Sequence, residues 1–372
     1  MRFPEFSGEW EETTLGKISE ITKGSGISKD QLSEQGSPCI LYGELYTKYK
    51  SEIIGEVYSR TELDSSSLVK SKANDVIIPC SGETAIDIST ARCVPFNNIL
   101  LGGDLNIIRL KNDDGGFFAY QLNGVRKTDI ARVAQGVSVV HLYGENLKQI
   151  TVYHPAIEEQ KKITRLLSLI DERIATQNKI IEDLKKLKSA ISLKMLHSDS
   201  WEQFKIQDIA SIGRGRVISS VEISQQENPL YPVYSSQTSN DGIMGYLDDF
   251  MFEGEYISWT TDGANAGTVF YRNGKFNCTN VCGLLKLKKG FDAHFVSLVL
   301  AEATRMYVST NLANPKLMNN TMGNIQIRLP KLEEQKRISV VFRKLHGLLE
   351  THNSLIIKYS KQKQYLLSQM FI

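Results

Sequence analysis

The chain has 372 residues, of which 41% are hydrophobic and 23% charged, and its formal net charge is +2. This length allows two domains with separate cores, and the composition is typical of a soluble globular protein, without a membrane-length apolar run or a signal peptide. The near-neutral charge means that composition alone does not indicate a nucleic-acid-binding protein. The cysteines, which are odd in number, favour a reduced, cytoplasmic setting: Cys39, Cys80, Cys93, Cys278 and Cys282.

Residues 10–150 have the pattern of short strands and turns. Runs rich in β-branched residues and leucine at 76–78, 99–101 and 105–108 are separated by clusters of Gly, Ser, Asn and Asp. Residues 123–134 favour a short helix, and the Asp-Asp-Gly-Gly run at 113–116 has the composition of a turn. We therefore predict a first β-rich domain over residues 1–152.

The next segment, 153–198, has the pattern of one long helix. Pro155 suits a first helical turn, and the acidic residues after it favour the positive end of the helix dipole. Apolar residues then recur in steps of three and four along a narrow stripe, with Gln177 at one stripe position. The stripe residues that we predict to form a coiled-coil seam are Ile163, Leu167, Ile170, Ile174, Ile181 and Leu184.

The same arrangement then repeats. Residues 150–163 return as 325–338 at a constant offset of 175 (330 − 155), and residues 201–215 resemble 10–24. This predicts a second β-rich domain over 199–328 and a second long helix over 329–372, with His352 in the stripe. Its predicted seam residues are Ile338, Phe342, Leu345, Leu349, Ile356 and Tyr359.

An isolated polar helix with one narrow apolar stripe is unstable in water, so we expect the two stripes to pack on each other. The simplest closure is antiparallel, with the end of the second helix near Trp10. The predicted fold class is α+β: two β-rich domains of similar fold, separated by two long antiparallel helices that form a coiled coil, in a quasi-cyclic, pseudo-two-fold arrangement.

Catalytic motifs are scarce. The spacing of Cys278 and Cys282 lacks a second ligand pair, so we expect two core cysteines and no zinc site. No histidine has a nucleophile or carboxylate at a diagnostic spacing, and no phosphate-binding glycine loop follows a strand. Methyltransferase and nuclease motifs are also missing, so the sequence favours a protein without catalytic activity of its own.

The loops instead carry hydrogen-bonding and basic residues at matching places in both halves. The matched stretches are 22–29 with 213–220, 41–48 with 233–238, 80–84 with 260–265, and 135–141 with 311–316. Such residues suit contacts with phosphates and base edges, although ordinary surface turns have a similar composition. The candidate DNA-binding residues are Lys23, Ser25, Tyr42, Glu44, Tyr46, Lys48, Ser81, Glu83, Thr84, Gln135, Ser138, His141, Arg214, Arg216, Tyr234, Ser236, Gln237, Thr261, Asp262, Asn265, Asn314 and Lys316.

A family resemblance rests on three features of the sequence. These are the duplicated Pro-x-x-Glu-Glu-Gln-Lys elements at 155–161 and 330–336, the Trp-Glu pair that opens each β-rich region, and the segment Arg2 to Trp10. Over essentially its whole length, the chain resembles the specificity subunit of type I restriction–modification systems.

That resemblance implies that each globular region is a target recognition domain reading one half of a gapped, double-stranded DNA target. The helices would set the spacing and dock two adenine methyltransferase subunits, through which restriction subunits join. S-adenosylmethionine, ATP and Mg would then bind to those partners, and no cofactor or metal to this chain.

Two other classes remain open at this point. One is a coiled-coil scaffold whose two β-rich modules bind protein or sugar without DNA specificity, which predicts no salt-dependent DNA affinity. The other is an enzyme, either a nuclease–methyltransferase fragment or a hydrolase, against which the missing motifs argue. The target bases, the spacer length and the presence of restriction subunits are not encoded in any recognisable motif.

Overall fold

Two compact units make up the part of the chain that the computed structural model describes, residues 2–309 and 314–371. Unit 1 contains Met1–Ile180 and His352–Ile372, and unit 2 contains Ile181–Thr351. These boundaries differ from the predicted domain boundaries, because each long helix contributes one part to each unit. Each unit is therefore a β-rich region together with the parts of the two helices that pack beneath it.

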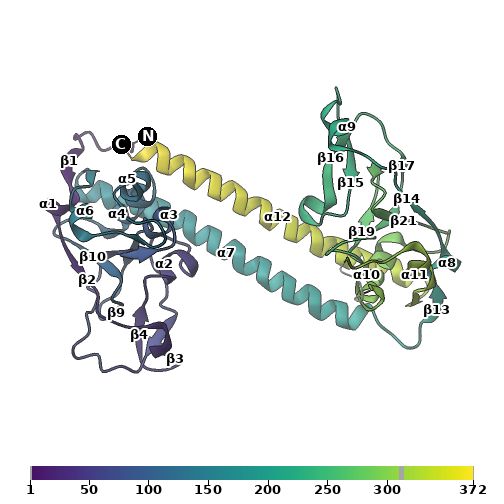
Figure 1. Ribbon diagram of the computed structural model, residues 1–372, viewed down its shortest axis with the longest axis horizontal. Helices are drawn as coiled ribbons and strands as arrows, with labels where there is room; N and C mark the ends of the chain where they lie inside the picture. Colours follow the sequence, from purple (N-terminus) through teal and green to yellow (C-terminus); the bar gives the residue numbers. More distant parts are fainter. Residues whose placement is uncertain (1, 310–313, 372) are drawn as a thin grey trace. The chain divides into compact units, whose positions relative to one another are not determined.

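Unit 1 is built on a four-stranded antiparallel sheet in the order β2-β10-β6-β8, against which helix α4 packs (Figure 1). A second sheet has the order β3-β5-β4-β9, in which β4 and β9 run parallel. The elements before the long helix are β1 (Glu11–Thr14), α1 (Leu15–Ile18), β2 (Ser19–Lys23), β3 (Leu32–Ser33), β4 (Ser37–Ile40), α2 (Glu44–Thr47), β5 (Ser59–Thr61), β6 (Asp75–Pro79), β7 (Ser81–Gly82), α3 (Ala85–Ile88), β8 (Arg92–Val94), β9 (Leu100–Leu101), β10 (Leu105–Leu110), α4 (Gly115–Asn123), α5 (Lys127–Arg132), β11 (Val140–His141), α6 (Gly144–Lys148) and β12 (Thr151–His154).

Unit 2 repeats this plan with sheets β14-β21-β18-β19 and β16-β15-β20-β17, and β15 and β20 are parallel as β4 and β9 are. Its elements are β13 (Glu202–Lys205), α8 (Ile206–Ile209), β14 (Ala210–Arg214), α9 (Ser220–Ser224), β15 (Tyr231–Tyr234), β16 (Ile243–Leu247), β17 (Phe252–Glu253), β18 (Tyr256–Thr260), β19 (Val269–Arg272), β20 (Lys275–Cys278), β21 (Cys282–Leu287), α10 (Ala293–Ala303), α11 (Asn319–Asn324) and β22 (Gln326–Leu329). The predicted similarity of the two β-rich regions is thus confirmed: the main sheets correspond strand by strand, and the second sheets share a parallel pair but differ in their end strands.

The short helix predicted over 123–134 is present as α5, with the narrower bounds Lys127–Arg132. The helix before it, α4, was not predicted. The predicted turn at 113–116 is the start of α4, where the Asp114 side chain accepts a hydrogen bond from Phe117 N at 2.8 Å. Asp before Gly-Gly reads as a turn locally, but the buried aromatic residues that follow make this segment a helix start.

The long helices are α7 (Ile157–Met195) and α12 (Leu332–Met370). In unit 1, the first part of α7 runs antiparallel to the last part of α12: Asp171 contacts Lys363, and Gln177 contacts His352 at 2.6 Å. In unit 2, Ile191 and Met195 of α7 pack in the same core as Ile338 and Phe342. The twelve predicted seam residues are all buried or half-buried.

The end of α12 closes on the start of the first β-rich region, within unit 1. The ring of Phe371 lies 6.3 Å from that of Trp10 and 5.2 Å from that of Phe117, measured between centroids. In unit 2, Leu196 after α7 joins the core that contains Phe295, the counterpart of Phe117. The quasi-cyclic connection expected from the sequence therefore has the same packing at both helix ends.

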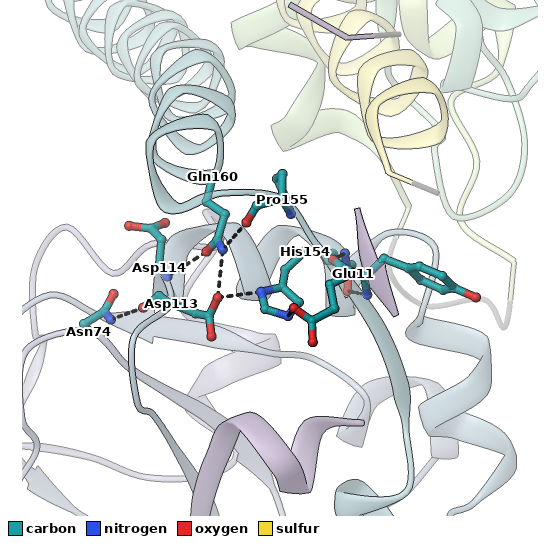
Figure 2. A network of polar contacts seen from close by, with 9 residues as sticks. Glu11, Asn74, Asp113, Asp114, His154, Pro155 and Gln160 are labelled. Atoms are coloured by element: carbon teal, nitrogen blue, oxygen red, sulfur yellow. Dashed lines mark hydrogen bonds and ion pairs between the residues drawn. The ribbon is translucent and has the colours of Figure 1, made fainter. Parts of the chain in front are cut away.

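The glutamine of the duplicated element locks each long helix to its β-rich region. Figure 2 shows Gln160 between the helix start and the segment before α4: its Nε2 donates to Pro155 O at 2.8 Å and to Asp113 Oδ1 at 2.7 Å. Its Oε1 accepts from Asp114 N at 2.9 Å. His154 Nδ1 lies 2.8 Å from the same Asp113 oxygen.

Unit 2 contains the same lock. Gln335 Nε2 donates to Pro330 O at 2.8 Å, and Gln335 Oε1 accepts from Asp292 N at 2.9 Å. Both glutamines are 1% exposed. The physical reason for the duplicated motif is therefore a buried amide that satisfies backbone groups at the junction of helix and domain.

We expect Gln160→Leu to lower the free energy of unfolding of unit 1 by about 2–4 kcal/mol, since the leucine leaves buried backbone groups unsatisfied. Gln335→Leu should cost less in unit 2, because Gln335 makes two of these bonds and Gln160 three. Urea unfolding followed by hydrogen exchange measures both. Glu158→Gln, on the exposed side of the same helical turn, is the control and should change little. Equal stability of wild type and Gln160→Leu would contradict the lock.

A buried ionic cluster also ties the helices to the β-rich region of unit 1. Lys363 Nζ lies 2.6 Å from Asp171 Oδ1 and also bonds Glu52, and the three side chains are 9–12% exposed. Tyr120 OH donates to the other Asp171 oxygen at 2.8 Å. Burial raises the pKa of Asp171 to about 6 from 3.8, although Lys363 opposes this shift.

The raised pKa of Asp171 predicts a pH dependence of stability. Between pH 4 and 6, the folded chain keeps a proton on Asp171 that the unfolded chain has released, so this group's contribution to stability falls as pH rises through that window. Asp171→Asn should remove the contribution. The measurement is the difference in unfolding free energy between wild type and variant across this pH range, and a difference that does not change with pH would contradict the assignment.

Candidate nucleic-acid interface

The first predicted loop follows the edge of each main sheet and lies against the carbonyl groups of a neighbouring strand. In unit 1, Gly24 N donates to Leu105 O at 3.0 Å and Ser25 N to Leu101 O at 2.9 Å. In unit 2, Arg216 N donates to Cys278 O at 3.2 Å. A Cβ on Gly24 or Gly215 would collide with the carbonyl oxygens of Gly102 and Cys278, respectively, so glycine is required at both positions.

Two more predicted loops are paired by short strands. β7 pairs with β11, so that Ser81 is opposite His141 and Gly82 opposite Val140. The counterpart in unit 2 is the bridge between Asp262 and Lys316, whose side chains approach to 3.6 Å. The loops 80–84 and 135–141 therefore lie side by side, as do 260–262 and 314–316.

In unit 1 the first and second predicted loops line a cavity of about 880 Å³. Its lining includes Lys29 from the first loop, Tyr42, Tyr46 and Lys48 from the second, and Asp104 from a neighbouring segment. The Tyr46 hydroxyl lies beside Gly82, 3.6 Å from the point where a Cβ added to that glycine would be, so this loop packs next to β7. Burial raises the pKa of Tyr46, so its hydroxyl stays protonated and can donate a hydrogen bond.

In unit 2 the basic residues are held by specific partners. Arg214 Nε donates to Asn319 Oδ1 at 2.9 Å, and Arg216 forms a two-pronged pair with Glu222. The guanidinium of Arg272 stacks 3.6 Å from the centre of the Tyr234 ring, and burial lowers the pKa of this arginine. These contacts orient the side chains before any ligand arrives.

The predicted residues differ in their access to solvent. Those exposed are Lys23, Lys48, Glu83, Thr84, Gln135, Ser138, His141, Arg216, Asn265 and Asn314. Those half-buried at the surface of the loops are Ser25, Tyr42, Tyr46, Arg214, Tyr234, Ser236, Gln237, Asp262 and Lys316. Of the predicted loop 311–316, residues 311–313 lie outside the described residues.

Three predicted residues are buried and already paired. Glu44, 5% exposed, accepts from Leu41 N at 3.0 Å and bonds Lys48 and Ser59. Ser81 contacts Asp104, and the Thr261 hydroxyl contacts Val281 O at 3.0 Å. These side chains shape the loops and are not presented to a ligand. The sequence could not show this, because a polar residue in a polar loop is expected to be exposed.

Sequence reasoning also missed residues that share these surfaces. Lys29 and Asp104 line the unit 1 cavity, and Asn319 positions Arg214. Asp104 follows a Gly-Gly pair outside the matched loops, and Lys29 is the last residue of the matched stretch 22–29 but is not among the candidate residues. Arg272 gave no signal, because it is an isolated arginine in a strand.

Over residues 2–309 and 314–371, no group of three or more His, Cys, Asp or Glu side chains is arranged to hold a metal ion. All five cysteines are buried and unpaired, including Cys278 and Cys282 at the ends of β20 and β21. No described helix is long and apolar enough to cross a membrane.

Comparison with protein families identifies this arrangement. The family described as type I restriction modification DNA specificity domain matches residues 7–186 and again 198–358, so both halves of the chain match it. The chain belongs to this family. The two matches correspond to the two β-rich regions with their long helices, and the specificity-subunit resemblance carried by the duplicated motif is confirmed.

Curated relatives of this chain include two proteins of Mycoplasma pneumoniae. A putative type I specificity subunit is 35% identical over 233 residues, which is 60% of this chain and 97% of the relative. The specificity subunit of the type I restriction enzyme MpnII is 41% identical over 177 residues, 46% of this chain and 53% of the relative.

Solved structures share the fold. The S subunit of a type I restriction-modification system from M. genitalium has a TM-score of 0.73 at 17% identity, covering 100% of this chain and 99% of that one. A chain from a structure describing complex assembly and conformational transition of the type I system has a TM-score of 0.55 at 14% identity, covering 98% of both chains. The α+β fold class with two similar recognition domains is therefore confirmed.

Proposed function

We propose that this specificity subunit recognises DNA sequence for a type I restriction–modification complex, with unit 1 and unit 2 each reading one half of a two-part target. The observation that carries the proposal is the repeated loop arrangement. The same close approach of a glycine and the same pairing of two loops occur in both units, on equivalent strands, while the side chains presented differ. A conserved scaffold with different presented residues suits the reading of two different half-sites.

The presented residues suit contacts with DNA. In unit 1, Lys29 and Lys48 are exposed lysines that line the cavity together with Tyr42 and Tyr46, a combination that neutralises phosphates and offers hydroxyl donors to base edges. In unit 2, Arg214 is held in place by Asn319, which reduces the entropy lost on binding.

The helices are proposed to dock two adenine methyltransferase subunits. The observation in support is the set of apolar side chains left outside the helix packing: Leu187 is 47% exposed and Leu348 46% in unit 2, and Ile357 is 56% exposed in unit 1. Leu348→Lys should weaken docking without unfolding the chain, whereas Leu349→Lys, at the half-buried seam, should affect both. Co-purification of the methyltransferase measures docking.

In this proposal the chain acts in the cytoplasm and is not itself a catalyst. S-adenosylmethionine, ATP and Mg bind to the methyltransferase and restriction subunits, through which double-stranded DNA is modified or cut. The buried, internally paired polar groups of this chain are consistent with a reading and positioning role.

Modified-base sequencing of the host genome, with this gene intact and deleted, tests the function. We expect N6-methyladenine to disappear from one gapped, two-part motif on deletion. Replacing residues 10–150 with those of another family member should then change only one half of the motif. An unchanged methylation map would overturn the proposal, and a change in both halves would overturn the assignment of one half to each unit.

A further inference from the structure

One lysine at an equivalent position in the two units has ion-pair partners in unit 1 and none among the described residues in unit 2. Lys188 and Lys363 occupy the same seam position, 175 residues apart, in unit 2 and unit 1. In unit 1, Lys363 is neutralised by Asp171 and Glu52 in the buried cluster described above. In unit 2, Lys188 forms no ion pair with any residue in the described part of the chain, and His346 takes the place of Asp171.

In unit 1, Glu52 belongs to an extended segment, residues 52–54, that hydrogen-bonds to the edge of the main sheet. Cys93 in edge strand β8 donates its N–H to Glu52 O at 2.8 Å, and Ile54 N donates to Cys93 O at 2.9 Å. Ile53 packs against the main core of the unit, and Ile54 is 1% exposed. The added segment thus has one acidic residue followed by two apolar ones.

The corresponding edge of unit 2 is strand β19. Cys93 is opposite Val76 in unit 1, and Tyr271 is opposite Ile257, the counterpart of Val76, in unit 2. Among the described residues, no extended segment hydrogen-bonds to the backbone of Tyr271 as Glu52 and Ile54 do to Cys93. The place that unit 1 fills with its own chain is therefore open in unit 2.

A cavity of about 510 Å³ occupies this place. It has an apolar wall and a basic end. The apolar wall comprises Val269, Phe270, Leu298, Ala301 and Phe342, and the basic end comprises Lys188, Arg343 and His346. Apolar side chains beside a basic end match the chemistry of the segment that fills the equivalent place in unit 1.

The acidic groups around this cavity make only long contacts with its basic end. Arg343 lies 3.8 Å from Glu255 and 4.0 Å from Asp292. Asp292 already caps α10 by accepting from Phe295 N at 2.7 Å, and Glu255 accepts from Tyr271 OH. Asp241 lines the cavity, and its backbone oxygen accepts from Arg272 at 2.8 Å.

The pKa of His294, which lines the cavity, is affected by burial and by the positive charge of Arg343. Burial lowers its pKa to about 4, and Arg343 lowers it further than any other neighbour. His294 is therefore neutral at physiological pH, and its Nδ1 lies 2.9 Å from Ser339 Oγ. Among the described residues that line the cavity, Lys188 is thus a cation without an ion pair, and Arg343 has only the two long contacts given above.

We propose that this cleft of unit 2 receives an extended acidic segment of a partner protein, which adds alongside β19, fills the cavity with apolar side chains and places a carboxylate on Lys188 and Arg343. Such strand addition gives affinity through the backbone and specificity through the side-chain pockets. The apolar wall favours a peptide over a phosphate, because a doubly charged ion would be desolvated there without partners on one side. The proposal is independent of DNA recognition by either unit.

The test uses the full chain and a fluorescent, end-capped peptide with the sequence of residues 51–55, Ser-Glu-Ile-Ile-Gly. We expect the peptide to bind and to protect the amides of β19 from hydrogen exchange. Lys188→Met should weaken binding by about tenfold, as should Gln in place of Glu in the peptide, since each removes one partner of a largely desolvated charge pair. Lys185→Met, an exposed lysine one turn away on α7, is the matched control and should not change the affinity.

Three outcomes would overturn the proposal. The first is no binding of the peptide, and the second is binding that Lys188→Met leaves unchanged. The third is protection of β8 in unit 1 in place of β19, which would mean that the peptide only displaces the chain's own segment. Inorganic phosphate is the competing probe: Lys188-dependent binding of phosphate without peptide binding would make the cavity an anion site.

Discussion

Replacing Lys363 with Met is expected to lower the free energy of unfolding of unit 1 by about 3–5 kcal/mol, because it leaves two buried carboxylates without their cation. Asp171 and Glu52 are 9% and 10% exposed, and the Lys363 ammonium is the ion-pair partner that they share. The loss should be largest above about pH 6, where Asp171 would carry its full charge, and smaller at pH 4, where it is protonated.

Lys188→Met is the matched control, since Lys188 lies at the same seam position of unit 2 and forms no ion pair with a carboxylate of residues 2–309 or 314–371. We expect it to change the stability of unit 2 by less than about 1 kcal/mol, as for an exposed charge without a strong pair. Urea unfolding with hydrogen exchange separates the two units. Similar losses for the two variants would show that the buried cluster contributes no more than an ordinary surface lysine.

The second large effect is expected at the paired glycines. Gly24→Ala and Gly215→Ala each place a methyl group against a carbonyl oxygen of a neighbouring strand, that of Gly102 and that of Cys278. Because backbone must move to relieve the collision, we expect each substitution to cost about 3 kcal/mol or more. The displaced segment in each case leads into the first candidate recognition loop.

The functional result should be specific to one half-site. Gly24→Ala should impair methylation through the half of the motif that unit 1 reads, and Gly215→Ala through the other half, measured on targets in which each half is varied separately. Gly26→Ala and Gly213→Ala are the controls, since neither added methyl has a heavy atom within 4 Å. If the controls reduce activity as much as Gly24→Ala and Gly215→Ala, the close approach is not what shapes the loops.

Much of the fold could be predicted from the sequence because its largest feature is periodic. The constant offset between Pro155 and Pro330 reveals the duplication, and the steps of three and four from Ile163 and Ile338 predict both long helices. Helical periodicity depends on the chain itself, so α7 and α12 end within three residues of the predicted ends at 198 and 372. The apolar runs at 76–78 and 105–108 predicted strands in the same local way, and they lie in β6 and β10, where they are buried.

Only the tertiary structure decided what individual polar residues do. Glu44 and Ser81 look like surface loop residues but are buried, and Gln160 looks like a solvated helix residue but bonds atoms on two other segments. The partners of Lys363 lie 192 and 311 residues away, and no described segment of unit 2 places a carboxylate at Lys188 as Glu52 is placed at Lys363. Hydrogen bonds and ion pairs form between groups that folding brings together, and no local pattern specifies a partner at such a separation. The sequence by itself therefore determined the duplication, the helices and the family, whereas burial and long-range pairing determined which loop residues can reach a ligand.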